Sequence, residues 1–65
     1  MSTRGETLLA ERSKRRVRQD RLAKRLGLMT STIVDIEYNR VGIDDMTFSR
    51  IMDAIKEDDI QEATR

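Results

Sequence analysis

Apolar residues recur along this chain at intervals of three and four positions, and no stretch alternates apolar with polar residues. Because an α-helix repeats every 3.6 residues, this spacing predicts helices rather than strands. The expected helices run from about Glu6 to Arg15, from Gln19 to Leu26, from Thr30 to Tyr38, and onward from a cap at Asp44 or Asp45. Gly27 and Asn39 should end the second and third of these, because glycine and asparagine best tolerate a left-handed backbone.

The apolar positions of these helices predict one shared core. Its expected members are Leu8, Leu9, Leu22, Ala23, Leu26, Ile33, Ile36, Phe48, Ile51 and Ile55, with Met29, Met46 and Met52 filling gaps. The mostly charged tail 57–65 is expected to extend the fourth helix, to form one turn or to fray. We therefore expect an all-α fold, with residues 1–65 forming a single compact bundle of four to five helices.

The composition excludes several classes of chemistry. With no Cys and no His among the 65 residues, the commonest metal ligands, disulfides and the commonest acid-base group are absent. The carboxylates are scattered, and no nucleophile-base pair or phosphate-cradling loop is evident, so neither an enzyme nor a cofactor or metal site is expected. No apolar run approaches the roughly 20 residues that span a bilayer, and the N-terminus lacks the apolar stretch of a signal peptide. We expect a soluble cytoplasmic protein with no membrane partner.

Charge is unevenly distributed along the chain. Residues 1–40 carry ten Lys and Arg against five Asp and Glu, whereas residues 41–65 carry three against seven. A basic face of this kind fits a polyanionic partner, but solvated helix surfaces produce the same pattern. Charge alone leaves the two interpretations equal.

The most informative segment, 18–38, consists of a short helix, a tight turn at Gly27 and a second short helix. Its defining residues are Gln19, Leu22-Ala23, Leu26-Gly27-Leu28, Ser31-Thr32-Ile33 and Ile36-Glu37. In this pattern the segment resembles the Cro and repressor-type helix-turn-helix family of phage repressors, antitoxins and small bacterial regulators, over roughly Leu8 to Ile55. The resemblance implies a transcriptional regulator, a repressor of the phage or mobile-element kind, that binds an operator in double-stranded DNA. It also implies a homodimer on a pseudo-palindromic site in the bacterial nucleoid.

The same resemblance assigns roles to individual residues. The outward face of the second short helix would meet base edges through Thr30, Ser31, Val34 and Asp35. Serine and threonine bond to several bases, Val34 can pack on a thymine methyl group, and Asp35 can accept from cytosine N4. Phosphates would be held by Arg15, Arg16, Arg18, Gln19, Tyr38, Asn39 and Arg40. Arg12 and Glu37 stand where the phage repressors have an ion pair between the first helix and the recognition helix.

Three residues depart from the family pattern. Arg16 replaces a frequent glycine, and Arg18 and Met29 precede helices where a small polar cap is usual. Because neither Arg nor Met can accept a bond from a backbone amide, we expect frayed or shifted helix starts at these two positions. Tyr38 could alternatively cap the core. A second function stays open, in which the fold serves as a protein-interaction module, such as an antirepressor or antitoxin, that binds a protein partner through its third helix or its acidic C-terminal part.

Overall fold

The computed structural model describes the backbone of residues 2–63 and the side chains as far as Asp59. This part of the chain forms four helices and no strand: α1 (Arg4–Lys14), α2 (Gln19–Leu26), α3 (Thr30–Glu37) and α4 (Asp45–Ala63). The predicted all-α fold class is confirmed, and the acidic tail as far as Ala63 continues α4 rather than forming a fifth helix. None of the described helices is long and apolar enough to cross a membrane.

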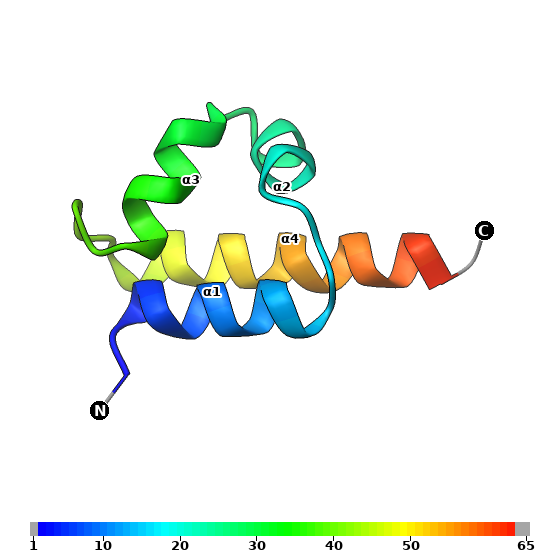
Figure 1. Cartoon of the computed structure of the whole chain (residues 1–65), viewed down its shortest axis with the longest axis horizontal. Helices are drawn as coiled ribbons and strands as arrows, with labels where there is room; N and C mark the ends of the chain where they lie inside the picture. The colour runs from blue at the N-terminus through cyan, green and yellow to red at the C-terminus, as the bar shows by residue number, and fades with distance from the viewer. Residues whose placement is uncertain (1, 64–65) are drawn as a thin grey trace.

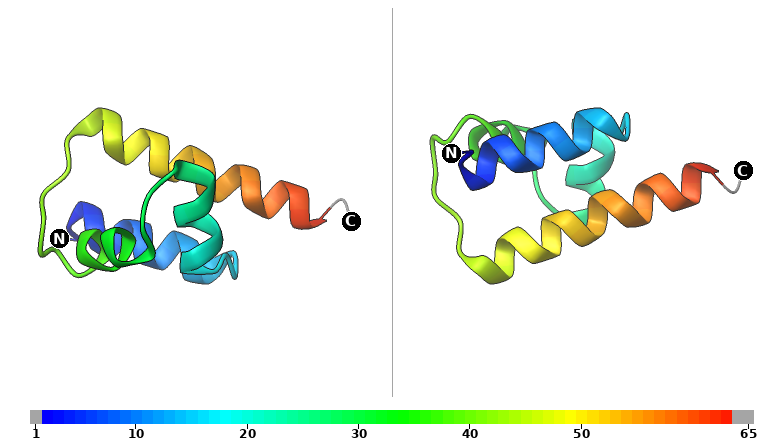
Figure 2. Two further views of the ribbon diagram at one scale, coloured as in Figure 1. Left: turned by 90° about the horizontal axis from the view of Figure 1, so that it is seen from above. Right: turned by 90° about the horizontal axis from the view of Figure 1, so that it is seen from below.

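The helices are arranged in two layers. α1 and α4 run side by side in roughly the same direction, and α2 and α3 lie over them (Figures 1 and 2). α2 packs on both α3 and α4, while α3 packs on α1 and α2. α3 therefore has one face on the body of the protein and one face directed away from the layer of α1 and α4.

A compact apolar core joins the two layers. Its buried members are Leu8, Val17, Leu22, Ala23, Ile33, Ile36, Ile51, Ala54 and Ile55, with Leu26, Ile43, Phe48 and Met52 packed around them. Most of these positions follow from helical periodicity, but Val17 lies in the loop before α2 and was not predicted. The prediction that Met29 and Met46 fill the core is wrong, because both side chains are largely exposed. Met29 stands in the turn before α3 and Met46 in the first turn of α4.

Three of the helices end in the same way. Arg16, Gly27 and Asn39 have positive φ values of 58°, 70° and 61°, and each follows a helix directly or by one residue. In each case the next residue donates its backbone N–H to the carbonyl five positions earlier, as in Val17 to Arg12 (3.0 Å) and Leu28 to Ala23 (2.8 Å). This is the Schellman arrangement, which satisfies the last carbonyls of a helix. The predicted left-handed exits at Gly27 and Asn39 are confirmed.

The helix starts use a wider range of partners. The Thr3 hydroxyl accepts from the Glu6 amide (3.1 Å), so α1 begins two residues before the predicted Glu6. The Asp44 carboxylate accepts from the Thr47 amide (2.8 Å) at the start of α4. α2 and α3 begin where predicted although no side chain of Arg18 or Met29 caps them, so the expected shift does not occur.

Gly5 allows α1 to approach the end of α3 closely. A Cβ atom at this position would lie 2.2 Å from the Ile36 carbonyl oxygen and 2.6 Å from the Asn39 side-chain oxygen. Real Cβ atoms essentially never come that close to another heavy atom. Glycine is therefore required where α1 supports the end of α3, a constraint that sequence periodicity does not reveal.

Candidate nucleic-acid interface

The outward face of α3 is small, polar and almost free of charge. Thr30 and Ser31 are exposed, and Val34 and Asp35 are partly exposed, while Ile33 and Ile36 on the opposite face are buried. The four side chains proposed for base contact therefore share the outer side of one short helix. Because α3 has only about two turns, few of its side chains face outward, and the chemistry of each one affects which bases the helix could recognise.

The end of α3 is fixed by a buried polar network. The Arg12 guanidinium forms two bonds with the Glu37 carboxylate, Nε to Oε2 at 2.5 Å and Nη2 to Oε1 at 3.1 Å. The side chains are only 14% and 2% exposed. Arg12 Nη1 also donates to the Val17 carbonyl (2.9 Å), and the Gln19 amide donates to Glu37 Oε1 (2.9 Å). The predicted pairing of Arg12 with Glu37 is present, and it ties α1, the loop before α2, α2 itself and α3 together.

Gln19 consequently has a different first partner from the one expected. Its amide nitrogen, predicted for a phosphate, is oriented by Glu37. A side-chain amide has two N–H donors, so one hydrogen is still available to an anion. The network thus connects Gln19, a candidate phosphate ligand, to Glu37 at the C-terminal end of α3.

A second pair of predicted residues meets at the same, C-terminal end of α3. Arg40 Nη1 lies 3.3 Å from Asp35 Oδ1, with the side chains 67% and 41% exposed. The backbone brings them together, because Arg40 donates its N–H to the Asp35 carbonyl (2.8 Å) after the left-handed residue Asn39. Tyr38 is exposed beside them, so the alternative in which it caps the core is wrong.

The basic residues that precede α2 differ in their surroundings. Arg18 forms a double contact with Asp20, Nε to Oδ1 at 3.0 Å and Nη2 to Oδ2 at 2.6 Å. This hydrogen bonding lowers the pKa of Asp20 and raises the pKa of Arg18. Both groups are at the surface, where water weakens such a pair. Arg16 is also exposed, in the left-handed loop position, and its side chain is accessible to an anion.

Arg15, by contrast, is shared between two carboxylates. It lies 3.3 Å from Glu11 on α1 and 3.2 Å from Asp59 on α4, and its side chain is only partly exposed. The charge of Arg15 is already balanced by these two carboxylates. Arg15 is therefore a poorer phosphate ligand than the sequence predicted.

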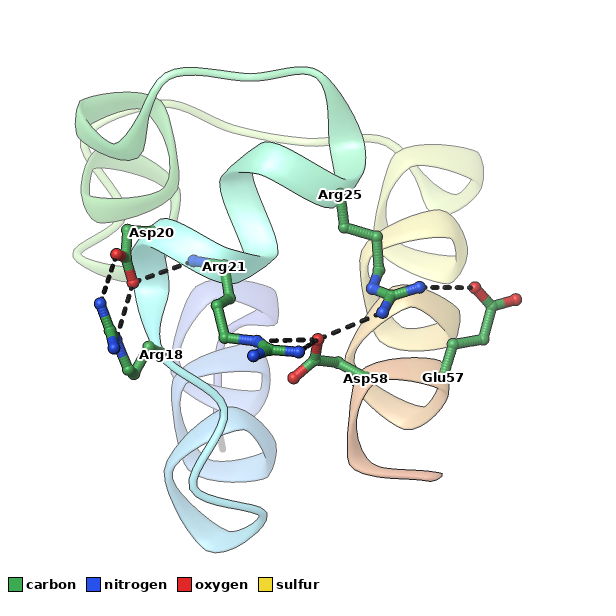
Figure 3. A network of polar contacts seen from close by, with 6 residues as sticks. All are labelled: Arg18, Asp20, Arg21, Arg25, Glu57 and Asp58. Carbon is green, nitrogen blue, oxygen red and sulfur yellow. Dashed lines mark hydrogen bonds and ion pairs between the residues drawn. The ribbon is translucent and has the colours of Figure 1, made fainter. Parts of the chain in front are cut away.

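The two arginines of α2 point toward α4, whereas Lys24 on the same helix is exposed. Arg21 and Arg25 converge on Asp58 Oδ1 at 3.1 and 3.2 Å, and Arg25 also approaches Glu57 at 3.8 Å (Figure 3). Asp58 is almost fully buried, although charge pattern alone placed it on a solvated tail. The sequence did contain a signal for the burial of Asp58: it lies one helical turn after Ala54 and Ile55 and so shares the side of α4 that faces the core. Part of the positive charge of residues 1–40 is thus balanced within the molecule by carboxylates of residues 41–65.

The arrangement offers a weakly charged helix whose end is held by a buried ion pair. Gln19 contacts Glu37 at this end, Arg16 and Arg18 are exposed in the loop before α2, and Tyr38, Asn39 and Arg40 directly follow α3. Comparisons of the chain with protein-family models, with curated proteins and with solved structures give no match.

Proposed function

We propose that this chain is a sequence-specific DNA-binding regulator of the helix-turn-helix type, in which α3 enters the major groove and α2 crosses the phosphate backbone. The observation that carries the proposal is the placement of Thr30, Ser31, Val34 and Asp35 on the outer face of α3. That helix is braced from behind by the buried Arg12 and Glu37 pair. A short helix with a fixed end and outward hydrogen-bonding side chains suits base recognition. A loosely held helix would have to become ordered on binding, and the entropy lost in that step would lower its affinity for DNA.

Phosphate contacts come from the residues that flank this face. Arg16, Arg18, Gln19, Tyr38, Asn39 and Arg40 supply donors that do not read sequence. Consistent with the family resemblance, the regulator acts as a homodimer whose two α3 helices reach half-sites about one helical turn apart, and it works in the bacterial cytoplasm.

The test begins with selection of binding sites from a randomised duplex library, followed by fluorescence anisotropy on the selected site and on a scrambled duplex. Ser31→Ala and Val34→Ala should each reduce the preference for the selected site, by about 1 to 3 kcal/mol where the side chain makes a good base contact. Ser49→Ala, an exposed serine on α4, is the matched control. Unchanged discrimination in both α3 variants would remove this helix from the groove.

Phosphate contact is tested by salt dependence. Arg18→Ala should weaken binding to both duplexes and flatten the slope of log affinity against log salt by about 0.9. Arg50→Ala, an exposed arginine on α4, should leave the slope unchanged. Equal slopes for wild type and Arg18→Ala would place Arg18 off the phosphate surface.

A second candidate function is a protein-docking module. A hollow of about 290 Å³ lies between the turn after α2 and the start of α4, lined by Leu26, Leu28, Thr47, Arg50 and Ile51. Leu28, Met29 and Met46 are exposed nearby in sequence. Absence of salt-sensitive binding to any duplex in the selection would favour this candidate over DNA binding.

A further inference from the structure

Asp35 is the one charged residue on the outward side of α3. Within Thr30–Glu37 the only other charged residue is Glu37, which is buried against Arg12. This helix contains no Arg, Lys, Asn or Gln, the side chains that form the two-pronged contacts to guanine or adenine. A carboxylate in this position would be repelled by DNA phosphates unless a cation accompanied it.

The fold supplies that cation in a fixed position. The Schellman turn at Asn39 returns the chain over the last turn of α3, and the Arg40 amide bonds to the Asp35 carbonyl at 2.8 Å. The Arg40 guanidinium then reaches the Asp35 carboxylate at 3.3 Å. The pair is a product of backbone geometry, because residues five apart in a continuing helix do not face each other.

The pair is also available to a ligand. Both side chains are substantially exposed, and an exposed ion pair contributes little to stability. Unlike the Arg12 and Glu37 pair, it can therefore exchange partners without loss of the fold.

We infer that Asp35 and Arg40 act together as a specificity determinant that selects a C·G base pair in each half-site; this inference rests on the proposed function. The Asp35 carboxylate accepts a hydrogen bond from the N4 amino group of cytosine, which presents a donor in the major groove. Arg40 balances the carboxylate charge and faces the adjacent phosphates. Val34, one residue earlier, can pack on a thymine methyl group, so we expect a thymine near the selected cytosine.

The experiment compares sites selected from a randomised duplex library by wild type, Asp35→Asn and Asp53→Asn. Asparagine is nearly isosteric with aspartate but pairs with adenine N6 and N7, so Asp35→Asn should change one C·G position per half-site to A·T. On the wild-type site, its discrimination at that position should fall by about five- to 150-fold. Asp53 is an exposed carboxylate on α4, and Asp53→Asn should select the wild-type sites.

The role of Arg40 is tested on a scrambled duplex. In Arg40→Ala the carboxylate has no counter-charge, so adding Asp35→Asn should raise affinity several-fold more in this background than in wild type. Equal effects of Asp35→Asn in both backgrounds would overturn the coupling. Identical site preferences for wild type and Asp35→Asn would overturn the inference while leaving DNA binding intact, whereas failure of wild type to select any site would overturn both proposals.

Discussion

The Arg12 and Glu37 pair is the interaction whose removal should change this protein most. We consider Glu37→Gln, which keeps the side-chain size and removes the charge. Glu37 Oε1 accepts from both Arg12 and Gln19, and Oε2 accepts from Arg12. An amide must turn its NH₂ group toward one of these donors, so at least one hydrogen bond is broken and a donor faces a donor.

The expected decrease in stability follows from burial. Arg12 is 14% exposed, so its charge would remain almost out of water with no carboxylate to balance it. Breaking a buried pair from one side costs about 3 to 5 kcal/mol. At about 0.05 to 0.15 kcal/mol per residue, a domain of this length has a total stability of about 3 to 10 kcal/mol. Glu37→Gln should therefore lower the melting temperature by more than about 10 °C.

The assay is thermal and urea unfolding followed by circular dichroism, for Arg12→Met, Glu37→Gln and the double variant. Each single change leaves one buried group without its partner, whereas the double variant removes both groups. The double variant should therefore be no less stable than the less stable of the two single variants. The matched control is Glu11→Gln, which breaks the partly exposed contact with Arg15, four residues later at the end of α1. That change should cost no more than about 0.5 kcal/mol. Small, additive decreases for Arg12 and Glu37 would refute the view that this pair braces α3.

Three further changes test the backbone geometry and the helix start. Gly5→Ala should destabilise the protein by about 1 to 3 kcal/mol in urea unfolding, because its Cβ would meet the Ile36 carbonyl. Gly42 has open space around it, so Gly42→Ala should not destabilise the protein in this way. Equal effects of the two changes would contradict the close approach of α1 to α3. Arg16→Gly should raise the stability by about 1 kcal/mol by relieving the left-handed conformation, and a lower melting temperature would argue against strain there. Bonds from Thr47 lower the pKa of Asp44, so its stabilising effect is complete above the ordinary pKa and is lost as the pH falls through the lowered one. Melting across pH should therefore show Asp44→Ala less stable than wild type near neutrality and nearly equal to it in strong acid, and a gap independent of pH would exclude the ionised cap.

The sequence alone determined the helical elements and the turns between them. α2 begins and ends at the predicted residues, and α3 differs by one residue at its end. These features depend on local physics: the 3.6-residue repeat of apolar positions, and the low cost of positive φ at Gly27 and Asn39. α1 begins earlier than predicted because the capping role of Thr3 was missed, although its signal, a threonine three residues before a glutamate, is local as well.

Tertiary structure alone decided which charged groups meet and which surfaces remain open. The contact of Arg21 with Asp58 joins residues 37 positions apart, and no local pattern shows that a basic residue on α2 faces a carboxylate on α4. The need for glycine at Gly5 likewise arises where α1 meets the end of α3. Long side chains such as Arg and Met suit either solvent or a partner, so their neighbours, and not their own preferences, fix their place. Those neighbours exist only once the helices have packed. The distance between residues on two crossing helices depends on how the helices cross, and it cannot be read from the number of residues between them.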